Sequence, residues 1–172
     1  MKEVVQKVER VLSNLKCGYK FEKKERFIKV FGKDILEVAF VAPSSSPVEF
    51  CGLSFNVGLC VSVTPSQDGG ANVEYQCAEY FGAAYNPRDV IEDALGCRSR
   101  EIMSYESAGR AYDGILDTLY EVYEGMLSRF SEEFEEALPD VYIVDRCYRP
   151  NPGEVPVRVR MVVGGHKHPE AV

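Results

Sequence analysis

Residues 51–63 read CGLSFNVGLCVSV, and every second residue in this stretch is apolar. The apolar positions are Cys51, Leu53, Phe55, Val57, Leu59, Val61 and Val63, and small or polar residues lie between them. A repeat of two residues predicts a β-strand with one buried face. Thirteen residues at about 3.3 Å each would span roughly 43 Å, which is longer than the usual strand. We therefore expect a bend or bulge near Gly58.

The residues before this stretch predict further antiparallel strands. Apolar and charged residues alternate from Tyr19 to Glu22 and again from Ile28 to Val30, with turns expected around 23–25 and at 32–34. In 35–42, one face is wholly apolar and the other carries Glu37 as its polar residue. We expect the strand at 35–42 to be central and covered on both sides.

Two long helices are predicted from apolar residues that recur every three or four positions. In the opening helix these are Val4, Val5, Val8, Val11, Leu12 and Leu15. In the second helix they are Ala108, Tyr112, Ile115, Leu119, Val122, Met126 and Phe130. The first helix is expected to end at Gly18, and the second to begin between Ser104 and Ala108 and to stop at Pro139.

Further strands are predicted at 73–81, 141–148 and 155–163, while 82–100 leaves helix and loop both open. Helix, strands, helix, strands indicates an α+β fold: a mostly antiparallel sheet with two long helices packed on it. We expect one domain over 1–163 and a C-terminal tail over 164–172.

Charge is segregated along the chain. The 172 residues carry a net charge of −7, yet residues 1–34 hold ten Lys/Arg and five Asp/Glu. Residues 101–140 hold eleven acids and two bases. Such asymmetry bears on association and partners rather than on fold.

The composition predicts a soluble cytoplasmic protein. No stretch approaches the roughly 20 apolar residues that span a bilayer, and the N-terminus scatters charges where a secretory signal needs an apolar run. Six cysteines occur with no Cys-x-x-Cys pair. This pattern is typical of reduced, buried thiols. We expect no membrane partner.

The second helix carries a run of acids that local helix stability does not explain. The candidate partner-binding residues are Asp113, Asp117, Glu121, Glu124, Glu132, Glu133, Glu135 and Glu136. Like charges four residues apart destabilise a helix slightly, and acids near its C-terminus oppose its dipole. Ser131 could relieve part of this cost by capping a new short helix after a break near residue 130.

Three interpretations of these acids are open. They could form a solvated face, or the basic N-terminal helix and hairpin could lie against them and neutralise them. In the third interpretation they bind a basic protein partner, such as a nuclease toxin, by imitating a phosphate backbone.

No catalytic motif was found, and the sequence favours a binding protein over an enzyme. It contains no phosphate-binding glycine loop, nucleophile elbow or His-Glu-x-x-His. His166 and His168 could bind a metal with Glu170 or Cys147, but such a pair in a polar tail is more often unliganded. We predict no cofactor, no metal and no nucleic-acid partner.

An alternative function uses the small-residue face of the strand at 51–63. Gly52, Ser54, Asn56 and Gly58 lie on this face. They could line a groove for a small molecule or substrate, or they could let a helix pack closely on the sheet.

The opening helix, the stretch CGYKFEKKERFIKVFG, the Ser/Pro loop and the FNVGL strand resemble a group of uncharacterised bacterial domains with a helix-then-hairpin layout. Some bacterial immunity proteins, which neutralise toxins from neighbouring cells, are similar small acidic α+β proteins. The resemblance covers about residues 4–63 and 108–130. It implies an inhibitor of a toxin and carries over no catalytic residue.

Overall fold

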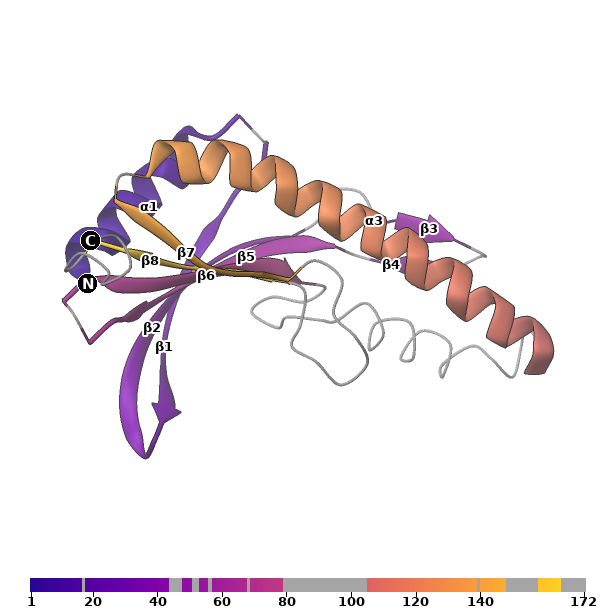
Figure 1. Cartoon of the computed structure of the whole chain (residues 1–172), viewed down its shortest axis with the longest axis horizontal. Coiled ribbons are helices and arrows are strands. Elements are labelled where there is room, and N and C mark those ends of the chain that lie inside the picture. Colours follow the sequence, from indigo (N-terminus) through magenta and orange to yellow (C-terminus); the bar gives the residue numbers. More distant parts are fainter. Residues whose placement is uncertain are drawn as a thin grey trace.

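The structure is a computed structural model (Figure 1). It describes residues 1–16, 18–43, 48–50, 53–55, 57–67, 69–78, 105–138, 140–147 and 158–164. For 48–50, 53–55, 78, 105–113, 115 and 116 it describes the backbone alone.

Figure 1 shows a twisted sheet with helices α1 (Lys2–Asn14) and α3 (Tyr105–Ala137) on one side of it. The sheet has six strands in the order β1-β2-β5-β6-β8-β7, and each neighbouring pair is antiparallel. The strands are β1 (Glu22–Val30), β2 (Lys33–Ala42), β5 (Gly58–Pro65), β6 (Ala71–Ala78), β7 (Val141–Cys147) and β8 (Arg158–Val163). Strands β3 (Val48–Phe50) and β4 (Leu53–Phe55) form a separate two-stranded sheet. The predicted α+β class is confirmed.

The main core lies between the helices and one face of the sheet. Its largest fully buried side chains are Tyr75, Tyr123, Phe130, Phe134, Leu59, Leu119, Leu127, Met161 and Val8. They come from α1, from α3 and from strands β5, β6 and β8, so one apolar layer joins segments that are far apart in the sequence. Both long helices therefore pack on the same face of the sheet.

The opening helix forms as predicted but ends earlier. Val4, Val5, Val8 and Leu12 are buried, which confirms the predicted apolar face. The helix ends at Asn14, and Leu15 is already extended, with φ −68° and ψ 143°. The predicted end at Gly18 was therefore wrong. Gly18 lies in the connection to β1 with a φ of +78°, a conformation that glycine adopts at little cost.

Strand β1 runs through the predicted turn at 23–25, so that prediction was wrong. Lys23, Lys24 and Glu25 pair in unbroken register with Phe40, Ala39 and Val38 of β2. The hairpin turn lies at Phe31 and Gly32, where φ is +50° and +77°. Positive φ at both central residues is typical of the tight turns that join antiparallel strands.

Strand β2 is covered on both sides in its second half, as predicted. Val38 and Phe40 belong to the main core, whereas Ala39 and Val41 form a second small cluster with Cys60 on the opposite face. Glu37, the polar residue of that opposite face, is buried and paired with Arg26 of β1.

The predicted break near Gly58 is confirmed and is larger than a bulge. Residues 53–55 belong to the small sheet, and β5 of the main sheet begins at Gly58. A Cβ atom at residue 58 would clash with the carbonyl oxygen of Ala42 and lie 3.1 Å from the Cα of Pro43. Only glycine lets the backbone of β5 enter the sheet this closely.

Helix α3 is continuous from Tyr105 to Ala137, so the break near residue 130 that capping by Ser131 would require does not occur. At 33 residues it is about 50 Å long. Ser131 does not cap a new helix. Its side chain is buried and faces β6, where its hydroxyl lies 2.5 Å from that of Tyr75.

Strands β6, β7 and β8 confirm the three remaining strand predictions in the residues that the structure describes. Their order could not be read from the sequence, because β8 lies between β6 and β7. The pairing of β7 with β8 shifts register between Ile143 and Asp145. The predictions for 79–81, for 82–100 and for most of the tail fall outside the described residues. No helix among the described residues has the length and apolar character needed to span a membrane.

Candidate functional site

The outer face of α3 carries half of the eight acids singled out in the sequence. We define the acidic face as Asp117, Glu121, Glu132 and Glu136, whose side chains are exposed. The opposite side of the helix carries the buried residues Tyr123, Leu127, Phe130 and Phe134. One rigid element thus presents four carboxylates to water while its other side is held in the core.

The structure gives the other predicted acids different surroundings. Glu133 accepts a 3.0 Å hydrogen bond from the backbone N–H of Lys16, just after α1. Glu135 pairs with Arg146 of β7 at 2.5 Å. Glu124 is half-buried, and the side chain of Asp113 lies outside the described residues. The acidic face therefore consists of fewer residues than the sequence suggested.

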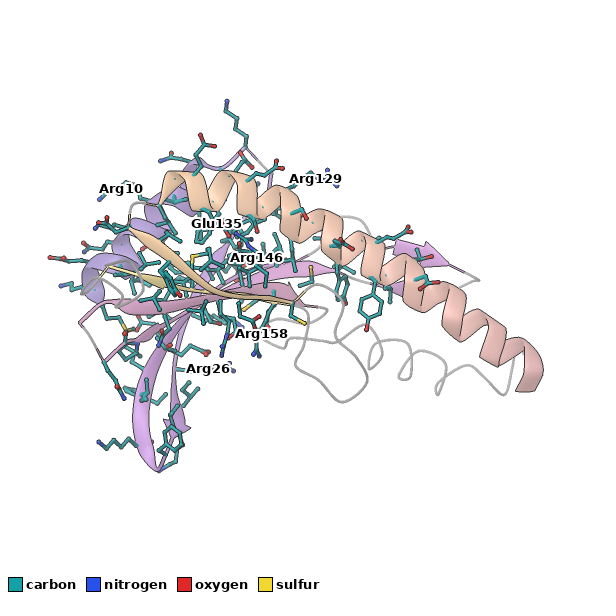
Figure 2. All side chains as sticks on the ribbon, in the orientation of Figure 1. Arg10, Arg26, Arg129, Glu135, Arg146 and Arg158 are labelled. Carbon is teal, nitrogen blue, oxygen red and sulfur yellow. The ribbon has the colours of Figure 1, made fainter. Side chains whose placement is uncertain are left out.

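Glu135 belongs to a polar cluster that fixes α3 on the sheet. The hydroxyl of Tyr75 donates to Glu135 at 2.6 Å and lies 2.5 Å from the hydroxyl of Ser131. Arg146 reaches both Glu135 and, at 3.4 Å, Ser131. Figure 2 shows Glu135 and Arg146 between α3 and the sheet. Burial, followed by the hydrogen bond to Glu135, raises the pKa of Tyr75, so its hydroxyl stays protonated and acts as a donor.

Aromatic rings surround this cluster and also pack α3 against the sheet. Phe130 and Phe134 stack with centroids 4.9 Å apart, and Tyr75 meets both edge-on at 5.0 and 5.5 Å. Phe21, just before β1, lies 6.1 Å from Phe130. Such contacts add to the energy of area burial and fix the rotation of α3 about its axis. The acidic face therefore has a defined direction.

The basic N-terminal region does not neutralise the acidic face in the ion pairs seen among the described residues. Lys23 pairs with Glu9 and Glu25, and Lys29 pairs with Asp34. These pairs stay within α1 and the β1–β2 hairpin. On α3 itself, Arg129 is exposed and its Nε donates to the backbone of Gly125.

Beside the small apolar cluster of Ala39, Val41 and Cys60, the opposite face of the sheet is polar, and this polar region was not predicted from the sequence. A hollow of about 440 Å³ lies there. Its lining includes Cys60 and the polar residues Arg26, Glu37, Ser62, Thr64, Asn72, Glu74, Gln76 and Arg160. In Figure 2, Arg26 and Arg158 lie on the side of the sheet away from α3. The sequence does contain the pattern, because this side consists of every second residue of β5, β6 and β8. Recognising one continuous polar face also requires knowing that these three strands are neighbours.

Glu74 is the most perturbed carboxyl on this face. Burial raises its pKa, although Arg158 and Arg160 oppose that shift. Arg158 lies 3.9 Å away, and Arg160 is the cross-strand partner of Glu74. Burial also raises the pKa of the Cys60 thiol, so Cys60 is not an activated nucleophile.

The variant Glu74→Gln is expected to gain stability over the wild type as the pH rises. A raised pKa means that folded Glu74 holds its proton more tightly than unfolded Glu74 does. The wild type therefore loses stability as the pH rises through the pKa of Glu74 in the folded state. The Gln variant does not ionise, so it does not have this loss. Urea unfolding at acidic and neutral pH measures the difference. Glu22→Gln, at an exposed position, is the control, and a difference that shrinks with rising pH would contradict the assignment.

The structure describes three of the six cysteines and most of the acids. Cys60 and Cys77 are buried and Cys147 is half-buried, all three as free thiols. Within the described ranges no group of three His, Cys, Asp or Glu residues could hold a metal ion. The predicted tail histidines and the residues Gly52 and Asn56 of the alternative groove lie outside these ranges.

Comparison with protein-family models, with curated proteins and with solved structures found no match to this chain. The resemblance to immunity proteins therefore stays a prediction.

Proposed function

We propose that this chain is a protein-binding module that holds a basic protein against the acidic face of α3. The observation that carries the proposal is the exposure of Asp117, Glu121, Glu132 and Glu136 on a helix whose other side is locked in the core. Positive charge on the partner would complement this face.

Helix stability gives no reason to keep these acids. Asp117 and Glu121 are four residues apart, as are Glu132 and Glu136, and each such like-charge pair costs a few tenths of a kcal/mol. Glu132 and Glu136 also lie in the last two turns, where negative charge opposes the helix dipole. Association with a cationic surface supplies a reason, since opposite charge raises the rate of encounter and rejects acidic competitors.

The proposed mechanism is occlusion without chemistry. A row of carboxylates on a rigid rod can take the place of a phosphate backbone on a cationic surface. Such a module suits an inhibitor of a basic toxin, for example a nuclease. This is the role that the resemblance to immunity proteins implies.

The double variant Asp117→Lys/Glu121→Lys is expected to slow capture of the partner by about tenfold or more at low salt. Both positions are exposed, so the fold should be unaffected. The partner is first isolated by affinity capture at low salt and release at high salt. Association rates are then measured for wild type and variant over a salt series. An unchanged association rate would reject the acidic face as the contact.

The matched control is Glu3→Lys/Glu22→Lys, which changes the net charge by the same amount at exposed positions on α1 and β1. If both double variants slow capture equally, total charge and not the acidic face determines binding. Thermal unfolding of all three proteins checks that the fold is retained.

A second candidate function is the binding of a small polar molecule on the opposite sheet face. The hollow of about 440 Å³, with arginine and glutamate side chains in its wall, favours it. A compound that stabilises the wild type and the Asp117→Lys/Glu121→Lys variant equally would support this function instead.

A further inference from the structure

Among the residues that the structure describes, strand β1 is an open edge of the main sheet. It has nine residues and pairs on one side with β2, in a register without a shift. Figure 1 shows the β1–β2 hairpin extending away from α3. Phe27 is 73% exposed in the middle of β1, and Phe31 at the tip is 101% exposed. Unpaired strand edges that carry apolar side chains tend to pair with another strand.

The geometry of the hairpin determines which backbone groups face the open edge. In a two-residue hairpin, the residue pair next to the turn is hydrogen-bonded, and the pairs then alternate along the ladder. Here the pair next to the turn is Val30 and Lys33. The N–H and C=O groups of Lys29, Phe27 and Glu25 therefore point away from β2, toward the open edge.

We propose that β1 pairs with β1 of a second copy of this chain, antiparallel, about a two-fold axis at Phe27. In this register Phe27 lies opposite Phe27 of the second copy. Glu25 lies opposite Lys29 of the second copy, and Lys29 opposite its Glu25. The interface thus has an aromatic pair at its centre and an ion pair on each side, all at positions with outward backbone hydrogen-bonding groups. Cross-strand aromatic and opposite-charge pairs both stabilise a sheet.

The registers on the N-terminal side of this one are unfavourable. Opposite residues of an antiparallel pair point to the same face of the sheet, so the axis must pass through a residue. An axis at Arg26 would set Arg26 against itself and Lys23 against Lys29. An axis at Glu25 would set Glu25 against itself and Lys24 against Arg26. Like charges directly opposite each other destabilise a sheet.

The register on the C-terminal side, with an axis at Ile28, lacks the favourable pairs. It would set Phe27 against Lys29 and Glu25 against Phe31, so both ion pairs and the aromatic pair would be lost. The axis at Phe27 therefore gives the best match of side chains among these neighbouring registers.

The same register accounts for the exposed tip. Phe31 comes to lie opposite Lys23 of the second copy. Lys23 lines a hollow of about 380 Å³ between α1 and the hairpin, with Met1, Val5, Leu36 and Val38 as its apolar lining residues. In this register, the exposed ring of Phe31 in each copy lies next to the apolar hollow of the other copy.

The charged side chains are available for these contacts. Lys29 and Glu25 are 75% and 60% exposed, and their present partners, Asp34 and Lys23, lie at 3.5 and 3.9 Å. Exposed pairs of this kind contribute little to stability, so exchanging them across the two copies costs little.

The test is a charge swap read by analytical ultracentrifugation over a range of concentrations. The wild type is expected to dimerise reversibly. Glu25→Lys and Lys29→Glu each turn two attractive pairs into two repulsive ones and should each weaken dimerisation by about tenfold or more. The double variant Glu25→Lys/Lys29→Glu restores opposite charges across the axis and should recover the dimer. The two single reversals change the net charge in opposite directions, so a total-charge effect would not weaken dimerisation in both of them.

Glu22→Lys is the control, because Glu22 is exposed on the same strand and lies opposite Gly32 in this register. It should leave dimerisation unchanged. The register is checked with Phe27→Cys: in a hydrogen-bonded pair the Cα atoms are about 5.5 Å apart, which suits a disulfide. Peptide mapping of the oxidised variant should find the two introduced thiols joined to each other across the axis.

Three results would overturn the proposal: a wild type that stays monomeric at millimolar concentration, a dimer indifferent to the single reversals, or a double variant that fails to recover. The contacts of this register come from β1, the hairpin tip and α1, and no residue of the acidic face is among them. Loss of the dimer and loss of binding at the acidic face are therefore separate results.

Discussion

Phe134→Ala is expected to lower the free energy of unfolding by about 3–5 kcal/mol. Phe134 is fully buried, stacks on Phe130 and meets the ring of Tyr75 edge-on. Truncation removes the transfer energy of the ring and leaves a cavity at the contact between α3 and β6, where rigid rings on both sides cannot close the gap. Urea unfolding monitored by circular dichroism measures the loss.

Two controls separate this effect from a general sensitivity to losing a phenylalanine. Phe134→Leu keeps most of the apolar volume and should cost less than the alanine variant. Phe27→Ala removes an exposed ring and should change the stability of the monomer by no more than about 0.5 kcal/mol. Equal losses at residues 27 and 134 would contradict the placement of the core.

Gly58→Ala is expected to destabilise the fold by about 2–3 kcal/mol. The added methyl group would clash with the backbone of Ala42 and Pro43, and backbone atoms cannot move aside as the end of a side chain can. The end of β2 would have to separate from the start of β5, close to the core residue Leu59. The same urea titration measures the effect.

Gly125→Ala is the matched control. Gly125 lies within α3, and a Cβ there meets nothing within 4 Å. Because alanine favours a helix more than glycine does, this variant should be more stable by about 1 kcal/mol. The same substitution thus has opposite signs at the two sites. A neutral Gly58→Ala would show that the close approach of β2 and β5 is not required.

The sequence predicted elements well where the physical signal was local. The alternation in 57–63 and the apolar face of Val4, Val5 and Val8 are patterns of neighbours, and both elements formed. The turn expected around 23–25 failed because charged residues on both faces of an edge strand look like a loop. Ladder pairing with β2 and the Lys23–Glu9 contact hold these residues extended.

What failed depends on contacts between distant residues. Ser131 looked like a helix cap because serine is common at caps. Its hydroxyl instead forms a hydrogen bond with that of Tyr75, which is 56 positions away in the sequence. Glu135 looked exposed because its partner Arg146 lies on another element, strand β7, whose position relative to α3 could not be read from the sequence. The polar face around Glu74 was invisible until the strand order placed Ser62 and Arg160 on either side of it. The exposure of Asp117 and Glu121, by contrast, followed from helical spacing, whereas Glu124 of the same predicted ridge is half-buried.

The strand order β6-β8-β7 has a consequence for how the chain is made. Strand β8, the last that the structure describes, is an inner strand, and both β6 and β7 use it as a ladder partner. A chain growing from the ribosome holds β6 and β7 with unsatisfied edges until residue 163 has emerged. The sheet therefore cannot form completely during synthesis before β8 is available. Until β8 has been synthesised, the unpaired edges of β6 and β7 are open to pairing with strands of other chains.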